Sequence, residues 1–456
     1  MQCRAGHCFM LWRRSRHDDR ERRRRRIYYM SASPLSLEHA RGLDAADPLR
    51  GFRSRFGFPR GERGEPVLYL CGHSLGLMPL NAREEVAQEL EDWERLGVIG
   101  HHSARRPWIP YQEALRPQIA ELVGCRGDEV ALMNSLTVNL HLMLASFYRP
   151  VRRRRCILIE AGAFPSDRYA ISSQLQWHGL DPQECLIELA PPSGEDLISE
   201  EAIEGVLSER GAEIALVLWP GVQYLTGQAF DLPRIASATR RAGAVIGFDL
   251  AHWVGNLPLS LSESEPDFAV WCSYKYLNAG PGAIAGCYIN SRHFSAPGRQ
   301  RLAGWWGYDL ARRFEMTHEF RAERGASGFQ VSCQSPLATA PLIASLAIFR
   351  EAGMNRLRAK SLALSAFLDQ LLAERTPELH SVTPHETPAR GAQLSLRIEG
   401  GAARGRSVFH WLTEHQVVCD WREPDIIRVS HVPLYNSFED VFRFVERLQR
   451  ALRESG

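Results

Sequence analysis

Lysine is almost absent from this 456-residue chain, although basic residues are not. Of its 55 lysines and arginines, only Lys275 and Lys360 are lysines. Lys275 stands between two tyrosines in the stretch WCSYKYLN, directly after an apolar run. An amine can lose its proton and attack a carbonyl, whereas a guanidinium in practice cannot. The placement favours a chemical role for Lys275 over two plainer interpretations, a solvated side chain and a lysine scarcity caused by a high-GC genome.

The chain also lacks paired cysteines and long apolar runs. Its ten cysteines are scattered and form no C-x-x-C pair, which argues against zinc ribbons and disulfide scaffolds. We therefore expect reduced thiols, no metal site, no signal peptide and a cytoplasmic location. No run approaches the apolar length that crosses a bilayer, so we expect no membrane partner.

Positive charge is concentrated at the start of the chain. Residues 1–29 hold ten arginines against three acids, a net charge of +7, which leaves −5 on the rest of a chain whose total is +2. A mildly acidic body argues against a nucleic-acid enzyme. The basic segment has three interpretations: a nucleic-acid-binding arm, an organelle-targeting segment, or a disordered extension translated upstream of a start at Met30. We favour the third.

A first helix is predicted over residues 81–96. Asn81 is placed to cap it. Val86, Leu90 and Trp93 then fall on one face, which is the amphipathic pattern of a helix packed on a core.

Between residues 156 and 290, short apolar runs alternate with polar, helix-permissive stretches. This alternation is typical of βα units around a mostly parallel sheet. The short GPG connection at 280–282 predicts a hairpin and one antiparallel strand. A second helix is predicted to begin near residue 134, with Asn134 or Ser135 as its cap.

These patterns predict an α/β fold with two folded units. We expect a large domain with a mostly parallel central sheet and a smaller α+β domain at the C-terminus. The predicted division is a basic extension at 1–29, a segment at 30–80 that joins the small domain, a large cofactor-binding domain at 81–335, and a connecting helix with the small domain at 336–456.

Three polar residues stand where such a sheet binds ligands. Asp249 ends the run AVIGFDLAH with His252 three residues later, Lys275 follows the next run, and Thr137 lies in the first turn of an earlier helix. Ligands of open α/β sheets bind at the carboxyl ends of the strands, and a helix N-terminus binds phosphate. An amine, an acid and a phosphate site fit pyridoxal phosphate. The plainer interpretation is a strand-end cap and a solvated lysine.

The chain resembles the kynureninase family of fold-type-I pyridoxal phosphate enzymes, within the aminotransferase superfamily. The resemblance runs from about residue 65 to the C-terminus. It rests on these motifs, which occur in order: HSLGLMP, RPW, MNSLTVNLHLM, AFPSDRYA, TGQ, GFDLAHWVGN, DFAVWCSYKYLNAGPG, GWWG and IIRVSHVPLYNSF.

The resemblance implies a role for each matching residue. Lys275 would form the Schiff base and act as the base, with Tyr274 as a phosphate ligand and proton relay. The cofactor would be bound by Leu136, Thr137, Phe164, Ser166, Asp167, Asp249, His252, Tyr274, Lys275, Trp305 and Cys333, with Phe164 stacked on the ring and Asp249 on the ring nitrogen. Arg428 would clamp the substrate's α-carboxylate, and His101 and Ser74 would lie near its aromatic end. Trp305 would reach the neighbouring active site of a homodimer.

The implied reaction is hydrolysis of L-kynurenine or 3-hydroxy-L-kynurenine to an anthranilate and L-alanine, in tryptophan catabolism and NAD-precursor synthesis. Three residues depart from the family pattern: His73, where asparagine is usual, Pro220, where a hydroxyl residue is usual, and Cys333, where asparagine is common. Cys333 and His101 fall where the 3-position of the ring would be recognised, which leaves the preferred substrate open.

The alternatives come from three classes. A cysteine desulfurase shares the fold and needs a nucleophilic cysteine, for which Cys333 is the candidate. A nucleic-acid-binding protein would act through residues 1–29. A cofactor-binding regulator would show no turnover, which the set Lys275, Asp249 and Arg428 argues against.

Overall fold

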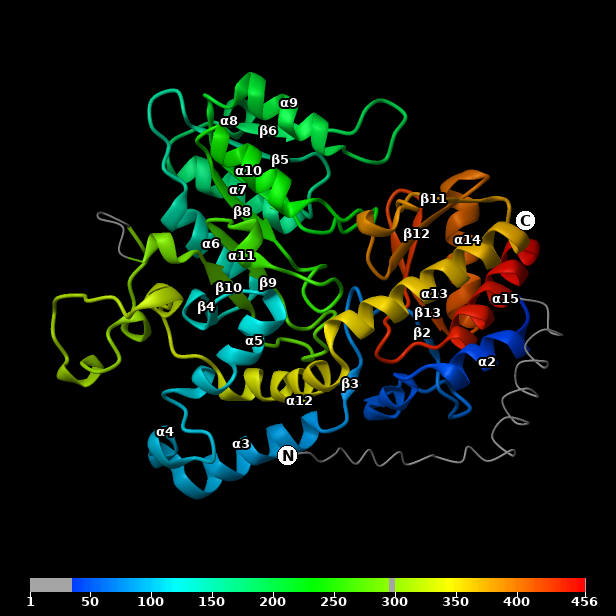
Figure 1. Cartoon of the computed structure of the whole chain (residues 1–456), viewed down its shortest axis with the longest axis horizontal. Coiled ribbons are helices and arrows are strands. Elements are labelled where there is room, and N and C mark those ends of the chain that lie inside the picture. Colours follow the sequence, from blue (N-terminus) through cyan, green and yellow to red (C-terminus); the bar gives the residue numbers. More distant parts are fainter. Residues whose placement is uncertain (1–34, 295–299, 456) are drawn as a thin grey trace, which may run out of the picture.

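A seven-stranded sheet forms the centre of the larger part of the molecule (Figure 1). The computed structural model describes residues 35–294 and 300–455, so the predicted basic extension at 1–29 lies outside the described residues. The strand order is β4-β10-β9-β8-β7-β5-β6. The strands are β4 (Val130–Leu132), β5 (Cys156–Glu160), β6 (Leu186–Leu189), β7 (Ile214–Pro220), β8 (Val245–Asp249), β9 (Phe268–Trp271) and β10 (Gly286–Ile289).

The strand directions agree with the apolar runs of the sequence. The strands β6, β5, β7, β8 and β9 run parallel to one another. Strand β10 runs antiparallel to both of its neighbours, β9 and β4. The predicted mostly parallel sheet and the predicted hairpin are therefore confirmed. Most of the sheet residues are buried, as expected for a sheet covered on both faces by helices.

The helices beside this sheet lie before, between and after its strands in the chain. They are α5 (Arg116–Val123), α6 (Leu136–Phe147), α7 (Pro165–Trp177), α8 (Pro182–Cys185), α9 (Glu200–Arg210), α10 (Leu232–Arg241) and α11 (Leu261–Ser264). Ser199 and Asp231 cap α9 and α10 through their side chains. Ser135 occupies the N-cap position of α6, as predicted, but its side chain makes no cap hydrogen bond.

The prediction for the first helix was right in extent and wrong in its buried face. Helix α3 (Ala82–Leu96) buries Glu89 and Asp92, whereas Leu90 and Trp93 are 47% and 61% exposed. The Glu89 carboxylate accepts hydrogen bonds from Arg106, Trp108 and Tyr111. This polar network outweighs the apolar pattern, because a buried carboxylate requires partners.

Asn81 does not act as the predicted side-chain cap of α3. It precedes the helix, but it makes no side-chain hydrogen bond there. The short helix α4 (Gly100–Ser103) follows α3, and both lie at the lower edge of the view in Figure 1.

A second, antiparallel sheet with the order β11-β12-β15-β14 forms the smaller part. Its strands are β11 (Leu379–Ser381), β12 (Gln393–Ile398), β14 (Asp420–Arg422) and β15 (Ile426–Ser430), packed with helices α13 (Met354–Arg375), α14 (Gly401–Glu414) and α15 (Phe438–Glu454). Helix α12 (Pro336–Ala352) leads into it, capped by the Ser335 side chain and ended by Gly353. The α+β character of this region is confirmed.

The N-terminal segment packs on the smaller part and also reaches the larger one. Helix α2 (Leu37–Ala46) packs on α15, and β2 (Leu68–Tyr69) pairs in parallel with β13 (Val417–Val418). The strands β1 (Phe56–Gly57) and β3 (Met78–Pro79) pair with each other. The proposed division of the chain at residues 30, 81 and 336 is compatible with this arrangement and stays a prediction.

Among the described residues, no single helix has the length and apolar composition to cross a membrane. Helices α12 and α13 pass that test only when taken together across an 80° bend.

Between β2 and β3 the chain touches the loop that carries the lysine. The backbone N–H of Gly76 donates a hydrogen bond to the carbonyl of Tyr274 at 2.8 Å. A Cβ at Gly76 would lie 2.3 Å from the carbonyl oxygen of Lys275 and 2.8 Å from the Cα of Asn278. Only glycine permits this approach, so the HSLG motif fixes the position of the lysine loop.

Replacing Gly76 by alanine should therefore destabilise the protein. We expect Gly76→Ala to lower the free energy of unfolding by about 1–3 kcal/mol, because backbone rather than a mobile side chain must move. Chemical denaturation would measure this. Gly205→Ala is the control, since Gly205 lies in α9 with open space around it, and it should be neutral or stabilising. Equal stability of Gly76→Ala and wild type would contradict the close approach.

Candidate active site

A pocket opens at the carboxyl ends of the parallel strands, where ligands of such sheets bind. Glu160 ends β5, Pro220 ends β7 and Asp249 ends β8, and all three line the pocket. The other lining residues are Leu136, Thr137, Ile159, Ala163, Phe164, Ser166, Asp167, Leu218, Val222, Tyr224, Ala251, His252, Tyr274 and Lys275. Nine residues predicted to bind the cofactor are thus brought together: Leu136, Thr137, Phe164, Ser166, Asp167, Asp249, His252, Tyr274 and Lys275.

Lys275 enters the pocket from the loop that follows β9. Its Nζ lies 3.0 Å from Nε2 of His252 and 5.8 Å from the centroid of the Phe164 ring. Burial and the nearby Lys275 hold the pKa of His252 well below its ordinary value, so the imidazole is neutral. A neutral His252 accepts a hydrogen bond from Nζ at Nε2 and carries its own proton at Nδ1.

Three carboxyls line the same pocket as the lysine, namely Glu160, Asp167 and Asp249. Burial raises the pKa of Glu160 to about 8 and raises the pKa of Asp167 and Asp249 as well. Lys275 opposes the effect at both aspartates, while Asp249 adds to it at Asp167. The Asp249 carboxylate also accepts the N–H of Ala251 at 2.7 Å. Asp249 is therefore the better stabilised anion of the two aspartates.

The opposite side of the pocket suits a phosphate group. Because Ser135 does not cap α6 with its side chain, the first-turn N–H groups of this helix remain available. The hydroxyls of Thr137 and Ser166 lie 2.7 Å apart beside them. A helix N-terminus together with two hydroxyls is a general arrangement for binding phosphate.

The residues present therefore fit pyridoxal phosphate. The pocket offers an amine, a carboxylate, an aromatic face and an anion site. Three buried polar atoms in its wall have no hydrogen-bond partner among the described residues: Nδ1 of His252, Oδ1 of Asp167 and Oε2 of Glu160. Unpartnered buried groups are rare and indicate a site that is completed by a ligand.

Five predicted site residues lie outside the lining of this pocket. Arg428 is buried just behind Tyr224, with its guanidinium 5.9 Å from the Tyr224 ring centroid. Ser74 is half-buried in the loop before Gly76. His101, Trp305 and Cys333 are exposed. Their predicted roles stay predictions.

Sequence reasoning missed Glu160, Tyr224 and Asp420. Glu160 ends a buried strand just as Asp249 does, so the same pattern could have found it. Tyr224 lies two residues before the TGQ motif but carries no spacing signal. Asp420 binds Arg428 through a pairing of β14 with β15, which no local pattern reveals.

Comparison with known proteins identifies the family. The family model described as the kynureninase C-terminal domain matches residues 357–448. Kynureninase from Xanthomonas campestris pv. campestris (strain B100) is 51% identical over 421 residues, covering 92% of this chain and 99% of that protein. Kynureninase from Myxococcus xanthus (strain DK1622) is also 51% identical, covering 92% and 98%.

The chain belongs to the kynureninase family. This membership confirms the resemblance carried by the motifs and, with it, pyridoxal phosphate as the cofactor.

Solved structures agree on the fold. The cysteine desulfurase CsdA from Escherichia coli has a TM-score of 0.71 at 17% identity, covering 89% of this chain and 98% of that one. An apo cysteine desulfurase from Thermococcus onnurineus NA1 has a TM-score of 0.70 at 16% identity, covering 85% and 95%. At such identities the likeness shows the fold alone. The kynureninase family therefore has the expected fold-type-I architecture here, and the desulfurase alternative has no support beyond the shared fold.

The buried Glu160 should make stability depend on pH. Its pKa is raised from 4.5 to about 8 in the folded chain, so the folded state binds more protons than the unfolded state between these values. Its contribution to stability is complete below pH 4.5 and is lost as the pH rises through about 8. In the cofactor-free protein, we expect Glu160→Gln to exceed wild type by about 2–4 kcal/mol in free energy of unfolding above this range, and to match it at the acidic end.

Denaturant titration across this pH range would measure the difference. Glu184→Gln is the control, because its side chain is 65% exposed and should leave the pH profile unchanged. A wild-type profile retained in Glu160→Gln would show that Glu160 ionises normally.

Proposed function

We propose that this chain hydrolyses L-kynurenine, 3-hydroxy-L-kynurenine or both, giving anthranilate or 3-hydroxyanthranilate and L-alanine. Kynureninases hydrolyse this carbon–carbon bond, as a step of tryptophan catabolism. The observation that carries the proposal is that Asp249, at the end of β8, and Lys275, in the loop after the neighbouring strand β9, line one pocket that fits the cofactor.

When bound, pyridoxal phosphate supplies an electron sink for the carbon next to the substrate's amine. Asp249 would hold the ring nitrogen, Phe164 would cover the ring, and the N-terminus of α6 with Thr137 and Ser166 would bind the phosphate. Leu136 and Asp167 complete the wall of the pocket.

Proton transfer is assigned to Lys275 and Tyr274. The Nζ of Lys275 would remove the proton from the substrate's α-carbon, with His252 holding Nζ in place. Burial raises the pKa of the Tyr274 hydroxyl well above its usual value, so this hydroxyl stays protonated and can donate a hydrogen bond, as the assigned role of phosphate ligand requires. Arg428 would bind the α-carboxylate, a task suited to a planar two-pronged donor.

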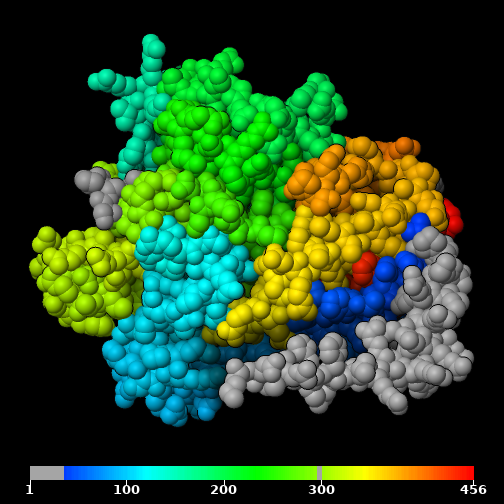
Figure 2. All heavy atoms as spheres, viewed as in Figure 1, coloured from blue at the N-terminus to red at the C-terminus, as the bar shows by residue number. Residues whose placement is uncertain are grey.

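A homodimer would complete the site. Helix α3 and the turn after it expose Leu90, Trp93, Val98 and Ile99, the last two at 79% and 60%. The segment that carries Trp305 also exposes Leu310, Phe314, Met316 and Phe320, and forms a lobe at the edge of the molecule (Figure 2). Apolar surface of this extent favours a protein partner. A second subunit covering it would account for the exposure of Trp305 and His101.

Lys275→Arg tests the central assignment. The variant keeps the positive charge but cannot link covalently to the cofactor, so it should lack the visible absorption of the lysine-linked cofactor and lose at least about 1,000-fold in kcat. Lys360→Arg is the matched control, since Lys360 is buried in an ion pair with Asp47 at 2.8 Å, and it should retain both properties. Normal turnover by Lys275→Arg would refute the proposed function.

Trp93→Arg tests the homodimer. Placing a charge in the apolar surface of α3 should raise the dimer dissociation constant by at least about 30-fold, measured by sedimentation velocity. Trp177→Arg is the control, because Trp177 is 83% exposed on α7, away from this surface. A wild type that is monomeric, or a Trp93→Arg protein that dimerises normally, would exclude this interface.

A further inference from the structure

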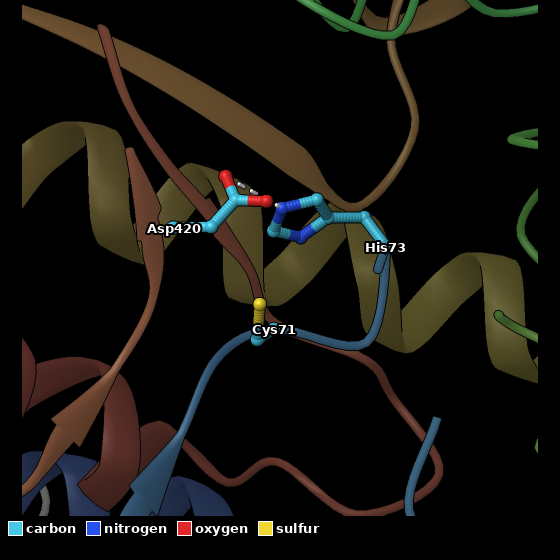
Figure 3. Close-up of side chains that lie close together, drawn as sticks. All are labelled: Cys71, His73 and Asp420. Carbon is cyan, nitrogen blue, oxygen red and sulfur yellow. Dashed lines mark ion pairs between the residues drawn. The ribbon is translucent and has the colours of Figure 1, made fainter. Parts of the chain in front are cut away.

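Cys71, His73 and Asp420 form a side-chain cluster beside the pocket (Figure 3). Their potential ligand atoms all lie within 4.8 Å of one another, and thiol, imidazole and carboxylate are the ligand types of zinc. The surroundings argue against a cation. Burial raises the pKa of the Cys71 thiol to about 12, and Arg428 and Arg422 already bind Asp420. The cluster instead faces the arginine assigned to substrate binding.

Asp420 holds the Arg428 guanidinium along one side. Nε donates to Oδ1 at 2.7 Å, and Nη2 donates to Oδ2. Nη1 donates to the carbonyl of Tyr224, a residue of the pocket wall. A guanidinium has five N–H donors, and these bonds use the Nε proton and one proton on each Nη. One proton on each Nη therefore remains for a second carboxylate.

His73 holds Asp420 in turn. Its ring is fully buried, and Nε2 lies 3.3 Å from Oδ1 of Asp420, a polar contact that does not reach hydrogen-bond geometry. Burial and the nearby Arg428 lower the pKa of His73 to about 4, so the imidazole is neutral near pH 7. A neutral ring packs against the Asp420 carboxylate without adding a positive charge next to Arg428.

We infer that His73 and Asp420 are positioning residues that orient Arg428, so that its free edge faces the pocket and receives the substrate's carboxylate. This inference rests on the proposed function of Arg428. Neither residue touches the reacting atoms. Their effect should therefore fall on ligands that carry a carboxylate, and on the strength of binding rather than on the chemical step.

The test compares two small amines that differ only at the carboxylate, L-alanine and L-alaninamide. Each is titrated into the holoenzyme, with visible absorbance as the readout. In Asp420→Asn and in His73→Ala, we expect the dissociation constant of L-alanine to rise by about 10-fold or more, the size of a lost charge-assisted bond, and that of L-alaninamide to change less than about 2-fold. With L-kynurenine, KM should rise while kcat stays nearly constant.

Two further variants sharpen the test. His73→Gln places an amide Nε2 where the imidazole Nε2 lies and should restore L-alanine binding that His73→Ala loses. This pair decides the question even if Asp420→Asn does not fold. Glu423→Gln removes an acid with a side chain 67% exposed in the same turn region and should bind both amines as wild type does.

Equal weakening of both amines, or unchanged L-alanine binding in Asp420→Asn and His73→Ala, would overturn the inference. Failure of the proposed function would look different. The wild type would then not cleave L-kynurenine, while the two amine titrations would still report whether Asp420 and His73 act through a carboxylate.

Discussion

The position of one amine among buried acids is the constraint on which the pocket depends. Lys275 acts on Asp249 and Asp167 in a pocket that Glu160 also lines, and each buried charge there needs a partner or must be neutralised. Burial raises the pKa of all three acids, and Lys275 opposes this rise at Asp167 and Asp249. The parallel sheet makes this possible, because it brings the ends of β5, β8 and β9 to one edge. The helices α6 and α7 then close the pocket with their N-terminal turns.

A line of contacts leads from this pocket to the smaller sheet. Phe164 lies under Nζ of Lys275 and packs edge-to-face on Tyr224 at 5.3 Å. Tyr224 accepts a hydrogen bond from Arg428 of β15, which Asp420 of β14 holds from the other side. The cofactor site and the carboxylate site are thus built by different sheets. A substrate that binds both must lie at their junction, and small errors in the packing of the two sheets would misplace one site against the other.

The sequence alone predicted what local patterns control. The apolar runs are strands, and the GPG connection lies in the turn between two antiparallel strands. Asp249 ends one strand and Lys275 lies in the loop after its neighbour, because short stretches of sequence determine burial and chain direction. The buried face of α3 could not be read in this way, since Glu89 recruits Arg106, Trp108 and Tyr111 from the following segment. The Asp420–Arg428 pair depends on the register of two strands, and no spacing rule gives the cross-strand partner of an arginine.

The scarcity of lysine limits the number of amines that could react with a carbonyl cofactor. A carbonyl cofactor can react with any accessible amine, whereas it does not react with a guanidinium under ordinary conditions. Lys360, the other lysine, is buried on α13 in an ion pair with Asp47 whose side chains are 7% and 4% exposed. Arginine supplies the remaining salt bridges of the surface. Among the lysines of the chain, only Lys275 therefore presents its amine to a pocket, so a reactive carbonyl entering that pocket meets a single lysine partner.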